Sequence, residues 1–193
     1  MKKSKFLPFV IVLIGLGGCT KGPALKVYSL DIPQVVTAKS SSYKNKNIKV
    51  TYPYSAKEEV SQKMNFTYSN SDRGSYQNSE WSNNMNKLLQ GTFIDMLDSS
   101  RLFKAVLLDT STAKEDYRLE SSIFAFHHSV RGSESYAVVS IQFILIDTES
   151  GHLVKSKRFS YREATSTTDA KGYAEATNIV IGRLSQDLVQ WLR

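Results

Sequence analysis

The stretch "YRLESSIFAFHHSVRGSESYAVVSIQFILIDTESGHLVKSKRFSYREA", residues 117–164, is the most regular part of the chain and decides its predicted fold. It consists of three runs rich in β-branched and aromatic residues, joined by the short connections RGSE and ESG. Each connection supplies a glycine, the residue that tight hairpin turns favour. The stretch therefore predicts a meander of three long antiparallel strands.

The middle run of this meander is apolar on both of its faces. One face consists of alternate residues that we expect to contact helices: Ala137, Val139, Ile141, Phe143 and Leu145. The other face, together with the preceding run, supplies a second apolar set: Phe124, Phe126, Val138, Ile144 and Ile146. Strands that are apolar on both sides are normally covered on both sides. Either the amino-terminal strands or loops cover the second set, or this set forms a surface for a partner protein or for self-association.

Helical periodicity occurs on both sides of the meander. Ahead of it, apolar residues recur at helical spacing: Trp81, Met85, Leu88, Leu89, Phe93, Met96 and Leu97. Ser79 is the expected N-cap of this helix, and Trp81 is expected in the core rather than at a partner contact. After the meander, a second helix is predicted from about Asp169, with its apolar stripe at Tyr173, Thr177, Val180, Ile181, Leu184, Leu188, Trp191 and Leu192.

Four shorter runs with strand character precede the meander. They lie at residues 25–32, 47–54, 63–69 and 102–108, whereas the turn-rich stretch SNSDRGSYQNS at 69–79 is expected to be a loop. Strands divided by two helices predict an α+β fold. We expect a mainly antiparallel sheet with both helices packed on one face, an α/β sandwich.

The amino terminus has the three parts of an export signal. Lys2, Lys3 and Lys5 are followed by an apolar run at 6–16 and then by small residues. The apolar run is shorter than the roughly 20 residues that a membrane-spanning helix needs. Leu16, Gly17, Gly18 and Cys19, the only cysteine of the chain, resemble a bacterial lipobox, which is cut before a lipidated cysteine.

The lipobox resemblance implies a division of the chain into three parts. Residues 1–18 would be the signal peptide, 19–24 a lipidated tether and 25–193 a single α+β domain. Cys19 would carry an N-acyl group and an S-linked diacylglycerol, and several acyl chains anchor a protein stably to a membrane. Thr20 stands where an aspartate would favour retention in the inner membrane. We therefore expect a protein of the cell envelope that faces the periplasm, on the outer membrane rather than the inner one.

Motifs of common catalytic sites are absent from the sequence. It contains no Walker A loop, G-x-S-x-G, H-E-x-x-H or C-x-x-C motif. His127 and His128 are neighbours on a predicted strand, so their side chains point to opposite faces and cannot chelate one metal ion. Glu115 and Asp116 are expected to be solvated loop residues. We expect no catalytic residue, no metal and no cofactor apart from the lipid on Cys19, although a periplasmic enzyme built from scattered residues stays open.

The formal net charge of +7 does not indicate a nucleic-acid partner, because lysine and arginine are dispersed along the chain. The one local concentration of lysines, residues 39–49, lies among serine and asparagine residues. It is interpreted as a solvated connection, with a contact to lipid headgroups as the alternative.

The whole arrangement resembles the family of ABC-type transport auxiliary lipoproteins. The matching features are the lipobox ending in Cys19, YSLDIP at 28–33, IKVTYP at 48–53, MNFTYS at 64–69, the stretch 79–106 with its EW start and LFKAV end, DYRLESSIFAF at 116–126, and a last helix ending in WL.

The resemblance implies a non-catalytic accessory lipoprotein of an envelope transporter of the mammalian-cell-entry (MCE) or Mla-like type, working in intermembrane phospholipid transport. Its partners would be a membrane, an ABC permease with its ATPase, an MCE-domain protein and, as a further option, other copies of itself. The alternative is a structural or assembly lipoprotein of an outer-membrane complex.

Overall fold

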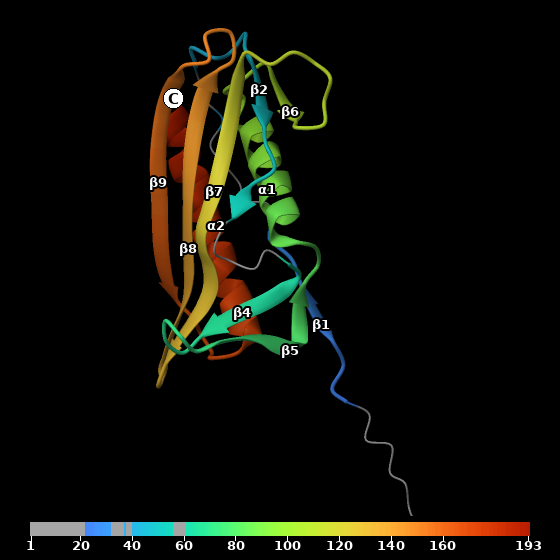
Figure 1. The fold of residues 1–193 in the computed structure, drawn as a ribbon, viewed down its shortest axis with the longest axis vertical. Coiled ribbons are helices and arrows are strands. Elements are labelled where there is room, and N and C mark those ends of the chain that lie inside the picture. The colour runs from blue at the N-terminus through green and yellow to red at the C-terminus, as the bar shows by residue number, and fades with distance from the viewer. Residues whose placement is uncertain (1–21, 32–36, 38–39, 56–60) are drawn as a thin grey trace, which may run out of the picture.

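The computed structural model describes residues 22–31, 37, 40–55 and 61–193, which form one nine-stranded sheet and two helices; Figure 1 shows their arrangement. The predicted lipidation site, Cys19, and the lipobox residues Leu16, Gly17 and Gly18 lie outside the described residues. The strands are β1 (Lys26–Tyr28), β2 (Asn47–Val50), β3 (Tyr54–Ser55), β4 (Lys63–Thr67), β5 (Arg73–Trp81), β6 (Ala105–Leu108), β7 (Tyr117–Arg131), β8 (Glu134–Asp147) and β9 (Leu153–Ala164). The helices are α1 (Met85–Ser100) and α2 (Ala170–Leu192).

The predicted meander is confirmed. β8 pairs antiparallel with β7 from Arg131 opposite Glu134 to Tyr117 opposite Asp147, and β9 continues the antiparallel order on the other side of β8. Gly132 and Gly151 in the two connections have φ angles of 60° and 72°. Glycine adopts this left-handed conformation without strain, so both connections can turn tightly.

The sheet as a whole is mixed, so a mainly antiparallel sheet is not confirmed. On the edge of β7 that faces away from β8, strands β2, β3 and β4 all pair parallel to it. β1 with β5 and β2 with β6 are also parallel, whereas β4 and β5 form an antiparallel pair. The sequence does not indicate whether two strands that lie far apart along the chain pair parallel or antiparallel, because that depends on the path of the chain in the folded protein.

The predicted first helix begins later than the apolar periodicity suggested. α1 starts at Met85 with Asn84 as its N-cap, and the expected cap Ser79 lies in β5 together with Trp81. β5 occupies most of the stretch that the sequence assigned to a loop. The reason is tertiary pairing: β5 lies between β1 and β4, and Trp81 N–H donates to the carbonyl of Gln62. Hydrogen bonds on both edges stabilise a strand of poor intrinsic propensity.

The second helix begins where the sequence predicted. Asp169 is its N-cap, and the Asp169 carboxylate accepts a hydrogen bond from the Gly172 N–H at 2.9 Å. Such a side-chain acceptor satisfies one of the amide groups left unpaired in the first turn.

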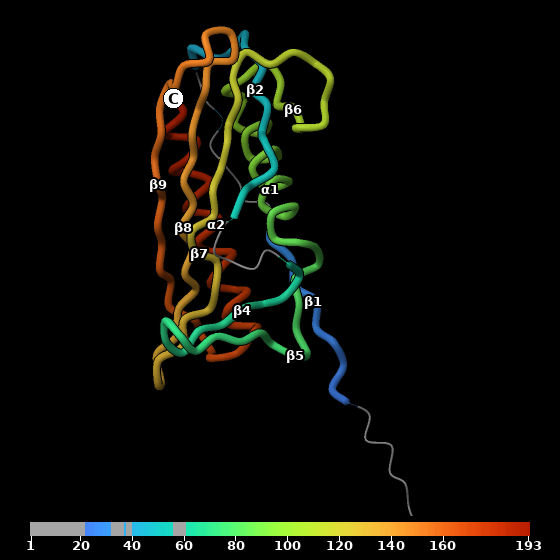
Figure 2. Tube along the Cα trace, in the orientation of Figure 1, coloured from blue at the N-terminus to red at the C-terminus, as the bar shows by residue number. Residues whose placement is uncertain are grey.

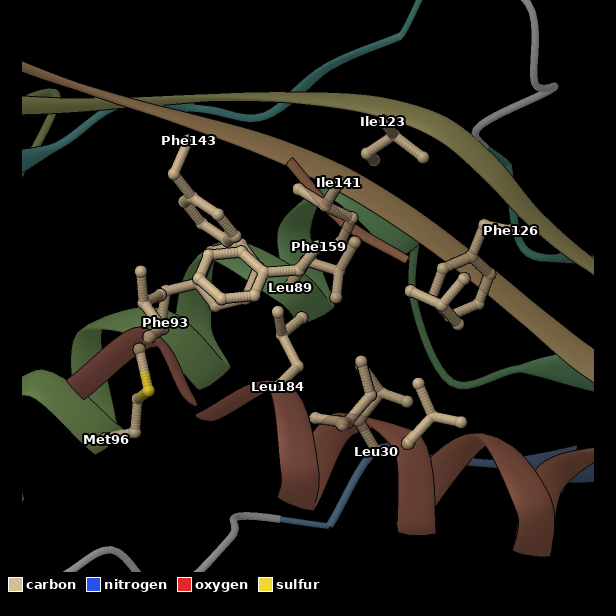
Figure 3. Packing of buried hydrophobic residues seen from close by; sticks show 14 of the residues in the cluster. Leu30, Leu89, Phe93, Met96, Ile123, Phe126, Ile141, Phe143, Phe159 and Leu184 are labelled. Atoms are coloured by element: carbon tan, nitrogen blue, oxygen red, sulfur yellow. The ribbon is translucent and has the colours of Figure 1, made fainter. Parts of the chain in front are cut away.

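Both helices pack against the same face of the long strands. The five alternate residues of β8 that the sequence assigned to the helix-facing side are completely buried: Ala137, Val139, Ile141, Phe143 and Leu145. Phe93 of α1 meets Phe143 edge-on with ring centroids 5.0 Å apart, and Leu184 of α2 enters the same cluster (Figure 3). Trp81 is 1% exposed within this core, as expected.

The two ends of the described chain lie at opposite ends of the molecule. The chain enters beside β1, near β4 and β5, and α2 ends at the far end of the long strands (Figures 1 and 2). A tether on the amino-terminal side therefore leaves from the β1 end.

Candidate functional site

The face of β7, β8 and β9 that points away from the helices is the candidate site, and we call it the open face. Its main members on β8 and β9, with Phe124 of β7, are Tyr136, Val138, Ser140, Gln142, Ile144, Ile146, Ser156, Arg158, Ser160 and Arg162, and the β7 residues opposite them, among them Glu120 and His127, belong to the same face. Val138, Ile144 and Ile146 are half-buried there, whereas their neighbours on the other face of β8 are fully buried. Within the described ranges, the two helices contact the opposite face, so this side of the strands can meet a partner.

A β-bulge separates the two phenylalanines that the sequence placed together. The register of β7 against β8 shifts between Ile123 and Ala125, so Phe124 is the extra residue. After the shift, Phe126 lies opposite Val139 on the helix side, where it is 5% exposed and meets Trp81 edge-on. Phe124 lies on the open face, and the assignment of Phe126 to the same surface is wrong, because one inserted residue reverses the alternation.

Two arginines of β9 lie on aromatic rings of the neighbouring strands. The guanidinium carbon of Arg158 is 3.3 Å from the ring centroid of Phe124, and that of Arg162 is 3.7 Å from the ring centroid of Tyr136. Both arginines are exposed. Such contacts, well inside the ~6 Å range of cation–π attraction, position the charged groups on the open face.

Between the two arginines the open face is polar. There the hydroxyl groups of Ser140 and Ser160 are 2.8 Å apart, and on the far side of Arg158 the Gln142 amide donates to the Ser156 hydroxyl at 3.1 Å. These cross-strand hydrogen bonds satisfy the polar groups of the strands themselves. The open face thus combines half-buried apolar side chains, a satisfied polar centre and two exposed cations.

One end of the same strands carries a buried ion cluster that the sequence did not indicate. The Glu115 carboxylate lies 2.7 Å from the Lys49 ammonium and 2.7 Å from the Arg118 guanidinium. Hydrogen bonds from Lys49 and then Arg118 lower the pKa of Glu115 to about 2. Asp116 accepts from the Asn47 N–H at 2.7 Å. Glu115 and Asp116 are therefore not simply solvated loop residues, because they join β2 to the start of β7.

At the other end, His128 lies in a buried aromatic cluster. Its ring is fully buried and is stacked on Tyr173 at 5.2 Å, and its Nδ1 atom is 2.7 Å from the Tyr76 hydroxyl. Burial lowers the pKa of His128 to about 4. His127 pairs with Val138 and lies on the open face, so the two histidines point to opposite sides as predicted. The described residues contain no group of three or more side chains suited to hold a metal ion.

A hollow of about 700 Å³ lies between the start of the described chain and the outer side of α2. Asn178 of α2 connects the two sides of this hollow, because its side-chain amide accepts a hydrogen bond from the Asp31 N–H at 3.0 Å and donates one to the Ser29 carbonyl at 3.3 Å. Its described lining also contains Lys171 and Glu175, which form an ion pair at 3.7 Å. Neither of the two described helices is both long and apolar enough to span a membrane.

Comparison with known proteins gives one family and a set of similar folds. The family described as the ABC-type transport auxiliary lipoprotein component matches residues 28–189. Protein XCC0632 from Xanthomonas campestris has a similar structure, with a TM-score of 0.76 and 18% identity over 86% of this chain and 94% of that one. An uncharacterized protein gives a TM-score of 0.69 and 14% identity over 89% and 100%. At these identities the two structures show the fold alone. No curated protein sequence matches the chain.

Proposed function

Because the chain belongs to the family of ABC-type transport auxiliary lipoprotein components, we propose that it is a membrane-anchored, non-catalytic accessory subunit of an envelope transporter of the MCE or Mla-like type. Its task in this proposal is to support phospholipid transport between membranes. Family membership supplies the link to an ABC transporter. The lipid cargo and the MCE-domain partner are our extension of that link.

The open face is the observation that carries the proposal. Apolar side chains such as Val138 and Ile144 are half-buried there, next to exposed arginines that lie on aromatic rings. Protein interfaces commonly have a central apolar patch with arginine and tyrosine among their strongest contacts. We propose that this face binds the MCE-domain protein or the permease.

The anchor in this proposal is lipidated Cys19. Residues 19–24 can reach roughly 20 Å when extended, since each residue spans about 3.5 Å. The described chain begins beside β1 at one end of the molecule (Figure 1). The domain would therefore stand with its β1 end toward the membrane, preferably the outer membrane, and its open face would form a side wall. A docked partner could then pass phospholipid between membranes without exposing the acyl chains to water.

A structural or assembly lipoprotein of an outer-membrane complex is the second candidate. It would use the same tether and the same open face. Its partner would be a β-barrel protein rather than an ABC permease, so the identity of the bound protein separates the two functions.

The experiment is a tagged pull-down from mildly crosslinked, detergent-solubilised membranes, with the wild type and Cys19→Ala in parallel. We expect the wild type to recover an ABC permease, its ATPase and an MCE-domain protein. We expect Cys19→Ala to lose them, because it lacks the anchor. Recovery of a β-barrel protein instead would support the second candidate and contradict the transporter role.

A further inference from the structure

We propose that Arg158 and Arg162 form a two-point receptor for carboxylate groups, so that the open face binds a protein surface carrying acidic side chains. This inference rests on the proposed function, because it takes the open face as the docking surface. It adds the chemistry of the partner, which family membership does not supply.

The short distances to the rings constrain how each guanidinium lies. With its carbon atom 3.3 Å from the Phe124 centroid and 3.7 Å from the Tyr136 centroid, an edge-on group would push its nitrogen atoms into the ring. Each guanidinium must therefore lie roughly parallel to the ring beneath it. All five N–H donors of an arginine lie in the guanidinium plane, so stacking leaves them free to bind oxygen atoms at the edge.

Neither arginine is neutralised by the described part of the chain. The carboxylates of Glu115 and Glu163 pair with other cations, Lys49, Arg118 and Arg183. Of the acidic residues on the open face, Glu120 lies opposite Ile144, and Glu134 accepts a hydrogen bond from the Tyr136 hydroxyl at 3.1 Å. Within the described residues neither carboxylate forms an ion pair with Arg158 or Arg162. Two positive charges that no carboxylate of the described chain neutralises favour a negatively charged surface, and a carboxylate can accept two parallel N–H bonds from one guanidinium.

The spacing of the two arginines sets the geometry of the partner. They are four residues apart on one strand and on the same face. At about 3.3 Å per residue, the two positions are roughly 13 Å apart. The Ser140 and Ser160 pair between them is already hydrogen-bonded. The fitting surface therefore carries acidic groups roughly 13 Å apart, with a region between them that needs no further donors.

A rigid protein surface fits this geometry better than a lipid surface. Stacking holds each guanidinium in a defined orientation, whereas headgroups in a fluid bilayer need no fixed spacing. The apolar side chains of the open face, Val138, Ile144 and Ile146, are half-buried and do not protrude as a membrane-inserting group would.

The test repeats the crosslinked pull-down with full-length, anchored variants. Arg158→Glu with Arg162→Glu reverses both charges and is expected to lower partner recovery more than about tenfold, as expected for hot-spot contacts. Arg158→Lys with Arg162→Lys keeps the charge but loses the planar donors, so recovery should be intermediate. Lys87→Glu with Lys104→Glu is the matched control, since both lysines are exposed and lie away from the open face. We expect the control to recover as much partner as the wild type.

The outcomes separate the inference from the proposed function. If the wild type recovers the transporter and the Arg→Glu pair recovers it equally well, the inference is wrong and the proposed function stands. If the wild type recovers a β-barrel protein and the Arg→Glu pair loses it, the carboxylate receptor stands and the transporter role fails. A wild type that captures no protein overturns the inference.

A vesicle experiment tests a membrane as the occupant of the open face. Cys19→Ala protein that lacks the predicted signal peptide, residues 1–18, is sedimented with phosphatidylglycerol vesicles, with and without the Arg→Glu pair. Little binding, equal for both proteins, is the result that we expect. If the protein binds the vesicles strongly and the Arg→Glu pair abolishes this binding, the open face recognises lipid phosphate. That result would contradict the inference that its partner is a protein.

Discussion

The two faces of β8 differ although their residues alternate along one strand. The helix-facing residues Ala137, Val139, Ile141, Phe143 and Leu145 are fully buried, whereas Val138, Ile144 and Ile146 of the open face are only half-buried. One face is packed against two helices, and the other meets serine, glutamine and arginine side chains of its own sheet. The comparison teaches that apolar residues on a strand do not by themselves show which face becomes part of the core. The difference lies in what covers each face, helices on one side and polar neighbours of the same sheet on the other.

The largest effect is expected on the buried face, from Phe143→Ala. It removes a ring that packs against Phe93 and Phe159, and it should lower the free energy of unfolding by about 3–5 kcal/mol. Urea denaturation followed by circular dichroism measures the change. Ile144→Ala, one position along on the open face, is the matched variant and should lose about 1–2 kcal/mol, because its side chain is only partly removed from water. If both variants lost the same free energy of unfolding, the two faces of β8 would not differ in their contribution to stability.

The second prediction concerns the ion cluster at one end of the strands. Glu115→Gln leaves the mostly buried Lys49 ammonium without its carboxylate, so the free energy of unfolding should fall by about 1–3 kcal/mol at neutral pH. The Glu115 pKa is lower in the folded state, so its contribution is present above the ordinary pKa and is lost as the pH falls from about 4.3 to about 2. Urea titrations across that range should show this loss in the wild type and not in the variant. An unchanged wild-type profile would contradict the pairing.

The third prediction concerns His128, which is buried on the helix side of β7. Desolvation lowers its pKa to about 4, with Asp169 and His127 as the nearby charged or titratable groups. The unfolded chain therefore binds a proton between pH 6.5 and 4 while the folded chain does not. The free energy of unfolding should fall with decreasing pH in this range, by at most about 1.4 kcal/mol per pH unit.

His128→Phe keeps the stacking on Tyr173 and removes the titrating group, so this part of the pH dependence should disappear. His127→Phe, on the opposite face, is the control and should retain it. Thermal unfolding between pH 4 and 7 measures both variants. If His128→Phe showed the same dependence of thermal stability on pH as the wild type, a group other than His128 would be responsible for it.

The smallest effect on stability is expected from the exposed cations of the open face. Arg162→Ala should change the free energy of unfolding by no more than about 0.5 kcal/mol, because exposed substitutions outside caps and networks are close to neutral. The same variant should weaken partner binding. Urea denaturation and the crosslinked pull-down, done on one preparation, distinguish an effect on stability from an effect on partner binding. A strongly destabilised Arg162→Ala would assign the arginine to the fold and not to a partner.

Local patterns in the sequence predicted a large part of the fold. Short glycine-containing connections indicated the meander, Asp169 indicated the start of α2, and strict alternation indicated the helix-facing residues of β8. Each of these features depends on residues within a few positions of one another. The family resemblance also came from such local motifs, and the family match over residues 28–189 confirms it.

Features that depend on distant partners could not be predicted. The bulge at Phe124 inverts an alternation that looked continuous, and β5 forms from serine, asparagine and glutamine because β1 and β4 bind its edges. The contact of Arg158 with Phe124 joins residues of two different strands across β8. Of the candidate site, the sequence therefore indicated the half-buried apolar residues and missed the arginines.

The central claim, that the open face meets the partner, is tested most directly by photo-crosslinking in intact membranes. Benzoylphenylalanine replaces Ser160, which lies exposed between Arg158 and Arg162, and in a second strain it replaces Lys87 on α1. We predict that the probe at position 160 crosslinks to a transporter protein and that the probe at position 87 does not. Crosslinks from position 87 alone, or equally from both positions, would contradict the assignment of the open face.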